Sequence, residues 1–250
     1  MTTRTDLDTP PGAAASPRRH LFRGGIASLL ALAFTRQAAA AAPPAAGDRH
    51  PGFADEMLDR VAITDLIMRE RWARETHAPD VAAACYHPEA RVEVSWFKGT
   101  AAEFVELGKR RPPEGVVNFD GMSPPVIWVR GQRAIADTAC AVHTHLVMDG
   151  VEVSAVSHTR LLWRAQVLDG RWLIAGLRGI YIRDTLQTAG PGQPLRLDPV
   201  RLARYRPSYR HLSYVLETTG RKPLDDLAGI DRPDLVEALR AAERAWLEQG

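Results

Sequence analysis

The chain has 250 residues, of which 25% are charged and 45% are hydrophobic, and its formal net charge is +2. This length suits one well-buried domain with appendages, and the ordinary composition argues against disorder or membrane spanning for the body of the chain. Part of the small positive excess lies in Arg18, Arg19, Arg23 and Arg36. Because no basic stripe stands out in the rest of the sequence, nucleic acid is disfavoured as a partner.

Residues 1–47 have the pattern of an export signal. The pair Arg18 and Arg19 precedes a moderately apolar stretch over 24–34 and an alanine run over 38–42. A charged segment, a short apolar segment and small residues are typical of a signal peptide, and paired arginines indicate the twin-arginine route. The apolar stretch is too short to span a bilayer, which needs about 20 residues. We therefore expect a periplasmic or secreted bacterial protein that uses the twin-arginine export machinery; a disordered basic tail is the alternative.

Helical and extended patterns alternate in the next part of the chain. Apolar residues at a three-to-four spacing predict a helix that Pro79 ends, and Thr100 and Glu103 have the spacing of a capping box at the start of another. The expected order is helix, short helix, strand and helix, over residues 53–76, 80–86, 91–97 and 100–109.

The strongest local signal is a run of long alternating segments from Ile127 to Asp184. It contains Asp149-Gly150 and Asp169-Gly170, and Asp-Gly between alternating apolar residues is typical of a β-hairpin turn. Long strands bend, and a bent sheet wraps a pocket. The predicted strands cover 133–148, 151–168 and 171–184, with shorter extended segments at 116–119 and 125–130.

Two helices are expected after a linker at 190–199. The first covers 205–219, with Gly220 as its C′ residue, and the second covers 233–247. The second helix carries an apolar stripe that includes Leu235 and Leu239, and such a stripe must be buried, most simply against the sheet. The resulting domain assignment is a signal peptide and linker at 1–47, a main domain at 48–190 and a helical extension at 191–250.

Several short motifs give the chain a family resemblance. They are Ala62-Ile63-Thr64-Asp65-Leu66, His87-Pro88-Glu89-Ala90, Gly99 before Glu103-Phe104, and Asp169-Gly170-Arg171-Trp172-Leu173-Ile174. In this order the region over 55–184 resembles SnoaL-like domain proteins of the nuclear transport factor 2-like superfamily, relatives of scytalone dehydratase and SnoaL-like polyketide cyclases. The resemblance implies an α+β fold in which a cone-shaped, curved antiparallel sheet packs against N-terminal helices, with a C-terminal helical pair. This superfamily includes isomerases, dehydratases, cyclases, dehydrohalogenases and non-catalytic binding modules.

The resemblance also implies a place for the catalytic groups. Enzymes similar to scytalone dehydratase or hexachlorocyclohexane dehydrochlorinase use an aspartate and a histidine inside the cone. The register puts Glu75 at the aspartate position with His77 two residues later, and Asn118 or Asp120 where the histidine belongs. The implied base is Glu75 or His77 with Asp120. Alternatively, Glu75 and His77 lie at a helix end that faces solvent, and Asp120 caps a turn.

His158 and Arg160 are two residues apart on a predicted strand and therefore share a face. Arg160 matches an arginine common in SnoaL-like proteins and would stabilise an oxyanion, and His158 would act as general acid or base. Alternatively, Arg160 forms a structural ion pair on the sheet, and His158 is a hydrogen-bonded histidine without a catalytic role. We expect both side chains on the concave face.

Further residues are candidates for contact with a substrate. His143 and His145 share a strand face, but no third ligand has suitable spacing, so we expect no metal. Aromatic residues either line the pocket or fill the core. The candidate substrate-binding residues are Tyr86, Trp96, Asn118, His143 and Tyr181.

These observations predict a cofactor-independent lyase or isomerase that abstracts a proton from a small hydrophobic, aromatic or alicyclic molecule, with elimination or dehydration. A specific version eliminates formaldehyde from lignin-derived dimers. A non-catalytic periplasmic ligand-binding or assembly module is the alternative, and a homo-oligomer is expected in either case. Cys85 and Cys140 are compatible with one disulfide or with two buried thiols.

Overall fold

The structure is a computed structural model that describes residues 52–190 and 192–249. The predicted export signal at 1–47 lies outside these residues. None of the helices within the described ranges is long and apolar enough to cross a membrane.

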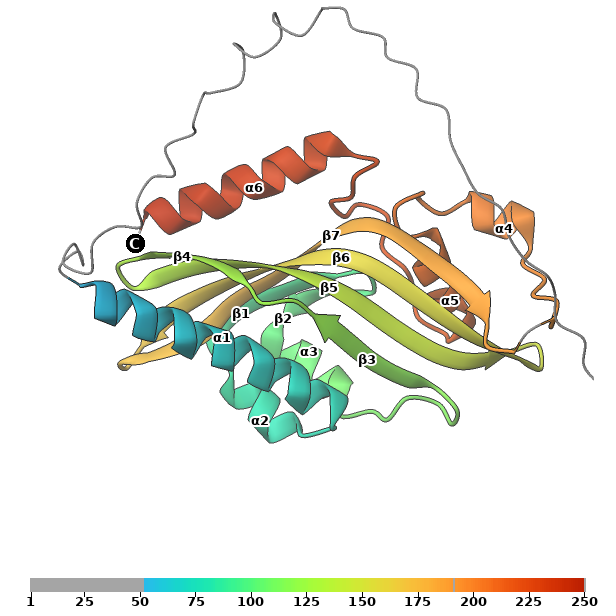
Figure 1. Ribbon diagram of the computed structural model, residues 1–250, viewed down its shortest axis with the longest axis horizontal. Helices are drawn as coiled ribbons and strands as arrows, with labels where there is room; N and C mark the ends of the chain where they lie inside the picture. Colours follow the sequence, from blue (N-terminus) through green and yellow to red (C-terminus); the bar gives the residue numbers. More distant parts are fainter. Residues whose placement is uncertain (1–51, 191, 250) are drawn as a thin grey trace, which may run out of the picture. The chain divides into compact units, whose positions relative to one another are not determined.

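A curved seven-stranded sheet forms the centre of the fold (Figure 1). Its strand order is β2-β1-β7-β6-β5-β3, and β4 also pairs with β5. The strands are β1 (Tyr86–Val94), β2 (Phe97–Thr100), β3 (Val117–Met122), β4 (Val126–Arg130), β5 (Arg133–Met148), β6 (Val151–Leu168) and β7 (Arg171–Thr188). The predicted α+β class and the long central strands are confirmed.

The two predicted hairpin turns join β5 to β6 and β6 to β7. Asp149 and Asp169 have φ values of 50° and 51°, and the glycine after each also has positive φ, as the turn requires. The expectation of a purely antiparallel sheet is wrong at one place, because β1 pairs with β7 in parallel. Parallel neighbours need a long crossover, which the intervening β2–β6 segment supplies.

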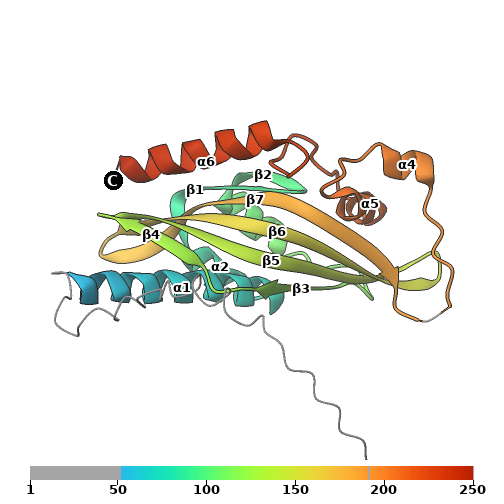
Figure 2. The same cartoon turned by 45° about the horizontal axis from the view of Figure 1, so that its top comes forward.

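Three helices lie beneath the concave face of the sheet (Figure 1 and Figure 2). They are α1 (Phe53–Glu75), α2 (Pro79–Ala84) and α3 (Ala101–Gly108), and the predicted capping box at Thr100 and Glu103 is present. Ile63 and Ile67 of α1 and Phe104 of α3 are buried with Trp163 of β6 in the main hydrophobic core. Burial of this apolar surface is the main force that holds the helices on the sheet.

The C-terminal helices contact different parts of the sheet. Helix α5 (Arg210–Thr218) packs Tyr214 and Val215 against Val153 and Ala155 of β6, at the end of the concave face that α1–α3 leave open. Helix α6 (Pro233–Glu248) instead places its apolar stripe on the convex face (Figure 1). The two predicted helices therefore exist, but each has its own contact with the sheet. The first begins at Arg210 and not at residue 205, because Pro207 disfavours helix in the residue before it. A separate short helix, α4 (Pro199–Ala203), precedes it.

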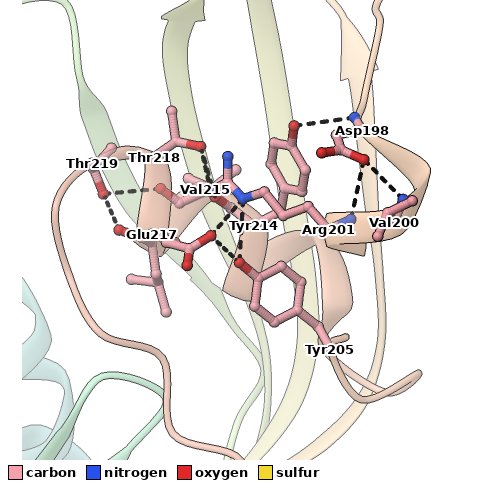
Figure 3. A network of polar contacts seen from close by, with 10 residues as sticks. Asp198, Val200, Arg201, Tyr205, Tyr214, Val215, Glu217, Thr218 and Thr219 are labelled. Carbon is pink, nitrogen blue, oxygen red and sulfur yellow. Dashed lines mark hydrogen bonds and ion pairs between the residues drawn. The ribbon is translucent and has the colours of Figure 1, made fainter. Parts of the chain in front are cut away.

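Helix α4 is joined to α5 by a polar network centred on Arg201 (Figure 3). The Arg201 guanidinium donates to the carbonyl of Tyr214 at 2.9 Å and to the Thr218 hydroxyl at 3.0 Å, and it pairs with Glu217. Asp198 caps the start of α4 by accepting from the amide of Val200 at 2.9 Å.

The contact of α6 with the convex face combines apolar and ionic pairs. Leu235 and Leu239 pack on Leu162 and Ile180. Four arginines form ion pairs with two buried acids around these leucines. Glu243 of α6 pairs with Arg164 at 2.6 Å and with Arg178 at 3.2 Å. Asp137 of β5 pairs with Arg160 at 2.7 Å and with Arg240 of α6 at 3.1 Å.

Candidate functional site

A pocket of about 410 Å³ lies between the concave face of the sheet and helices α1, α2, α3 and α5. Its walls are mostly apolar, with Leu161 and Leu177 from the sheet and Leu212 and Leu216 from α5. Volumes of this size are typical of small-molecule sites. Polar groups enter the pocket from the last turns of α1 and from β3.

Asp120 of β3 is a partly exposed carboxylate in the pocket lining. Its Oδ2 accepts a hydrogen bond from Nη1 of Arg71 at 3.0 Å, and its backbone amide donates to Oε1 of Glu75 at 2.7 Å. Within the described part of the chain, no group donates a hydrogen bond to Oδ1, and the side chain keeps 13% exposure. One oxygen is therefore fixed by the protein, while the other is free to accept a proton or a hydrogen bond from a ligand.

Arg71 is held in place by a second, enclosed carboxylate. Glu70 is fully buried, and it accepts from Nε of Arg71 at 2.6 Å and from the Tyr86 hydroxyl at 2.8 Å. Burial alone would lower the pKa of the Arg71 guanidinium, but the carboxylates of Glu70 and Asp120 raise it above its ordinary value. Burial, and then Glu70, raise the pKa of the Tyr86 phenol. Tyr86, Glu70, Arg71, Asp120 and Glu75 thus form a continuous chain of polar contacts that ends at the pocket.

The mouth of the pocket carries exposed polar residues. Glu75, His77 and Asn118 all line it. His77 has φ 55°, and the amide of Ala78 donates to the carbonyl of Ala73 at 2.8 Å, which is the geometry that ends a helix with a left-handed residue. The Asn118 side chain accepts from the Thr144 hydroxyl at 2.8 Å.

An aromatic wall with two guanidinium groups faces the same pocket. Trp96 and Phe104 stack with ring centroids 5.5 Å apart, and Tyr181 lies nearby in the lining. The guanidinium carbon of Arg74 lies 3.9 Å from the Phe104 ring centroid, and that of Arg221 lies 4.2 Å from the Trp96 ring centroid.

Six of the ten predicted site residues therefore line one pocket. They are Glu75, His77, Trp96, Asn118, Asp120 and Tyr181. The end of α1 therefore lies beside β3 at this pocket, as the resemblance implied. Their chemical roles remain predictions.

The placement of the other four is wrong. Side chains alternate along β6, and Thr159 and Leu161 are the ones that face the pocket, so His158 and Arg160 point to the convex side. His158 is exposed there, and Arg160 pairs with Asp137 under α6.

His143 and Tyr86 are also outside the pocket lining. His143 lies opposite Phe119 in the β3–β5 pairing, and the two rings stack 4.4 Å apart. His145 lies on the same side, 5.8 Å from the Phe119 ring. Tyr86 is buried behind the pocket, where its hydroxyl donates a hydrogen bond to Glu70. Among the described residues no group of three or more His, Cys, Asp or Glu side chains is suited to hold a metal ion.

Glu70, Arg71, Arg74 and Arg221 were not predicted from the sequence. A signal for the first three was present: charges at positions 70, 71 and 74 interrupt the apolar face of a helix that is buried as far as Ile67. Charged residues on a buried helix face require partners. Arg221 has no local signal, because its place depends on how the segment after α5 returns to β1 and β2.

The geometry defines an α+β protein built around a small-molecule pocket with a polar network at one side. Residues 55–178 match the SnoaL-like domain model, and this part of the chain belongs to the SnoaL-like domain family.

A PEP2-like protein of the fungus Fusarium vanettenii is 26% identical over 218 residues, covering 82% of this chain and 92% of the relative. Pea pathogenicity protein 2 of the same fungus is 24% identical over 192 residues, covering 74% of this chain and 82% of the relative.

Similar solved structures include a hexachlorocyclohexane dehydrochlorinase from Novosphingobium barchaimii, with 15% identity and a TM-score of 0.45, covering 58% of this chain and 99% of that one. A Mycobacterium tuberculosis protein of unknown function has 17% identity and a TM-score of 0.46, covering 70% of this chain and 98% of that one.

Proposed function

We propose that this protein is a cofactor-independent lyase or isomerase that removes a proton from a small, largely apolar substrate, with Asp120 as the base. The free Oδ1 of Asp120 is the observation that carries the proposal. A carboxylate with one oxygen fixed and the other open to a mostly apolar pocket is suited to general base catalysis.

In the proposed step, a C–H proton next to a carbonyl or hydroxyl group of the substrate moves to Oδ1 of Asp120. The C–H electron pair forms a new double bond, and a hydroxyl on the neighbouring carbon leaves with the proton from Asp120 as water. In an isomerase, the same proton returns to a different carbon. Arg71 positions the carboxylate through Oδ2, and Glu75 positions the Asp120 backbone.

A non-catalytic ligand-binding module is the second candidate, and the exposed mouth formed by Glu75, His77 and Asn118 is compatible with it. The two candidates differ in what Asp120 does. A binding module needs Asp120 for affinity at most, whereas the lyase needs it for turnover.

The test is turnover of a panel of hydroxylated aromatic and alicyclic compounds, with lignin-derived dimers and formaldehyde detection as one arm. We expect Asp120→Asn, which keeps the shape and the Arg71 contact, to lower kcat by about 10²–10⁴-fold, the usual contribution of a general base. His158→Asn is the matched control, because His158 is exposed on the convex side, and it should leave kcat unchanged. Full turnover by Asp120→Asn would exclude the proposed base, and binding without turnover by the unaltered chain would favour the binding module.

We also propose that the chain is exported, with residues 1–47 as the signal peptide and linker. The support is the sequence pattern of Arg18 and Arg19 before the apolar stretch. Expression in a bacterium with and without functional twin-arginine machinery tests this: the envelope fraction should contain a shortened chain in the first case, and Arg18→Lys with Arg19→Lys should prevent it.

A further inference from the structure

Arg221 is a cation in the pocket lining without an acidic partner. Its guanidinium lies over Trp96 at 4.2 Å, and no carboxylate within the described ranges pairs with it. The acids nearest in sequence have other contacts, since Glu217 pairs with Arg201 and Asp226 with Lys98. The side chain of Arg221 is exposed, and partial burial of its guanidinium against the pocket wall lowers its pKa with no neighbouring charge to oppose the shift. The guanidinium is therefore accessible to a ligand and has no counter-charge.

The backbone holds Arg221 firmly in this position. Gly220 has φ 80°, which turns the chain at the end of α5, and the amide of Arg221 then donates to the carbonyl of Leu216 at 2.8 Å. Three residues later the amide of Leu224 donates to the carbonyl of Ser95 at 2.8 Å. The segment is thus fixed both to α5 and to the residue next to Trp96.

Arg74 adds a second incompletely neutralised cation to the same wall. Its nearest acid is Glu70 at 3.9 Å, but the two oxygens of Glu70 already accept from Tyr86 and Arg71. Burial, and then the charge of Arg71, lower the pKa of Arg74. The Trp96–Phe104 wall therefore presents apolar ring surface together with positive charge.

We infer that the pocket takes an organic carboxylate with an apolar body of one or two rings, and that Arg221 is the anchor for its carboxylate. A guanidinium binds a carboxylate through two parallel N–H donors, and burial of the pair in an apolar pocket strengthens it. The ring body would lie along Leu161, Leu177 and Leu216. This inference rests on the proposed function for the identity of the site, and it names the substrate class of that site.

The experiment is calorimetric titration of the full chain at neutral pH with 2-naphthoate and with 2-naphthamide, which has the same shape without the charge. We expect the acid to bind at least tenfold more tightly than the amide, because hydrogen bonds to charged groups contribute about 1.5–3 kcal/mol. Arg221→Met should abolish this preference and leave the affinity for the amide unchanged. Lys222→Met is the matched control, because it removes the same charge from the next position, which is also exposed but lies outside the pocket lining, and it should keep the preference.

If Arg221→Met does not fold, Arg221→Lys provides the test. This variant keeps the charge without the two-donor geometry and should weaken binding of the acid at least threefold. Equal binding of acid and amide by the unaltered chain, an acid preference that survives Arg221→Met, or binding of neither probe would overturn the inference. Turnover measurements separate the inference from the proposed function: an acid preference in the unaltered chain together with full turnover by Asp120→Asn, or with no turnover of any compound in the panel, retains the carboxylate anchor and rejects only the base.

Discussion

At the scale of single residues, Glu70 is tightly constrained by its burial and its hydrogen bonds. It is fully enclosed and bonded to both Tyr86 and Arg71, and Arg71 in turn holds Asp120 at the pocket. A charge so deeply buried is tolerated only while its partners remain, and loss of one partner leaves the other unpaired.

We therefore predict that one of two substitutions lowers the free energy of unfolding more than the other. Glu70→Gln leaves the buried Arg71 with one counter-charge fewer and should lower the free energy of unfolding by about 3–5 kcal/mol. Tyr86→Phe removes a single hydrogen bond to a charged acceptor and should cost about 1.5–3 kcal/mol. Urea unfolding of both variants measures this, and a smaller loss in Glu70→Gln than in Tyr86→Phe would contradict the network.

The two cysteines give a prediction about pH. Both are free and buried, so no disulfide joins them, and burial raises the pKa of Cys85 to about 11 and that of Cys140 to about 12. An unfolded thiol ionises near pH 8.5, so the unfolded chain loses these protons first and the stability falls as the pH rises from about 8.5 towards 11. Below that range the thiols make no pH-dependent contribution.

At about pH 8, iodoacetamide should therefore label neither thiol in the native protein and both after denaturation, because the thiolate is the reactive form. A Cys85→Ala, Cys140→Ala variant should show a flatter decline of stability above about pH 8.5. Rapid labelling of the native chain would show that the thiols are accessible.

At the scale of elements, the sequence predicted what is locally determined. The Asp149 and Asp169 hairpin turns need residues that tolerate positive φ, and the chemistry of the turn is contained in the turn itself. The face of β6 that becomes concave is different. Leu161, Leu162 and Trp163 are all buried, because α6 covers one side and the core the other, so alternation disappears where it would have identified the inner face. His158 and Arg160 were misplaced for this reason.

The Arg201 network allows a test of whether α4 and α5 act as one unit. Arg201→Ala removes the contacts with the Tyr214 carbonyl, Thr218 and Glu217 (Figure 3) and should cost about 1–2 kcal/mol, since Glu217 is 44% exposed and its ion pair is screened. Hydrogen exchange should accelerate over 199–205 and stay unchanged over 233–248. Equal acceleration in both segments would show a global loss of stability instead.

At the scale of the whole molecule, α6 decides how much of the convex face is open. The family resemblance predicts a homo-oligomer formed through the sheet, which stays a prediction. Leu162 and Ile180 are not available for such a contact, since Leu235 and Leu239 cover them. The uncovered part of this face carries Phe119 and the two histidines that stack on it.

Detaching α6 from the sheet should therefore expose an apolar surface that favours self-association. Leu235→Glu with Leu239→Glu opposes burial of the helix on Leu162 and Ile180, and the exposed apolar area should drive self-association above whatever state the unaltered chain adopts. Light scattering coupled to size-exclusion chromatography at several concentrations measures the mass. Ala238→Glu is the matched control, because Ala238 is on the exposed side of the same helix and its replacement should leave the mass unchanged. If the double variant keeps both the mass and the stability of the unaltered chain, then α6 is not held by its apolar stripe. Its three arginine–acid pairs with the sheet and the two arginine contacts with the Trp246 ring must hold it instead.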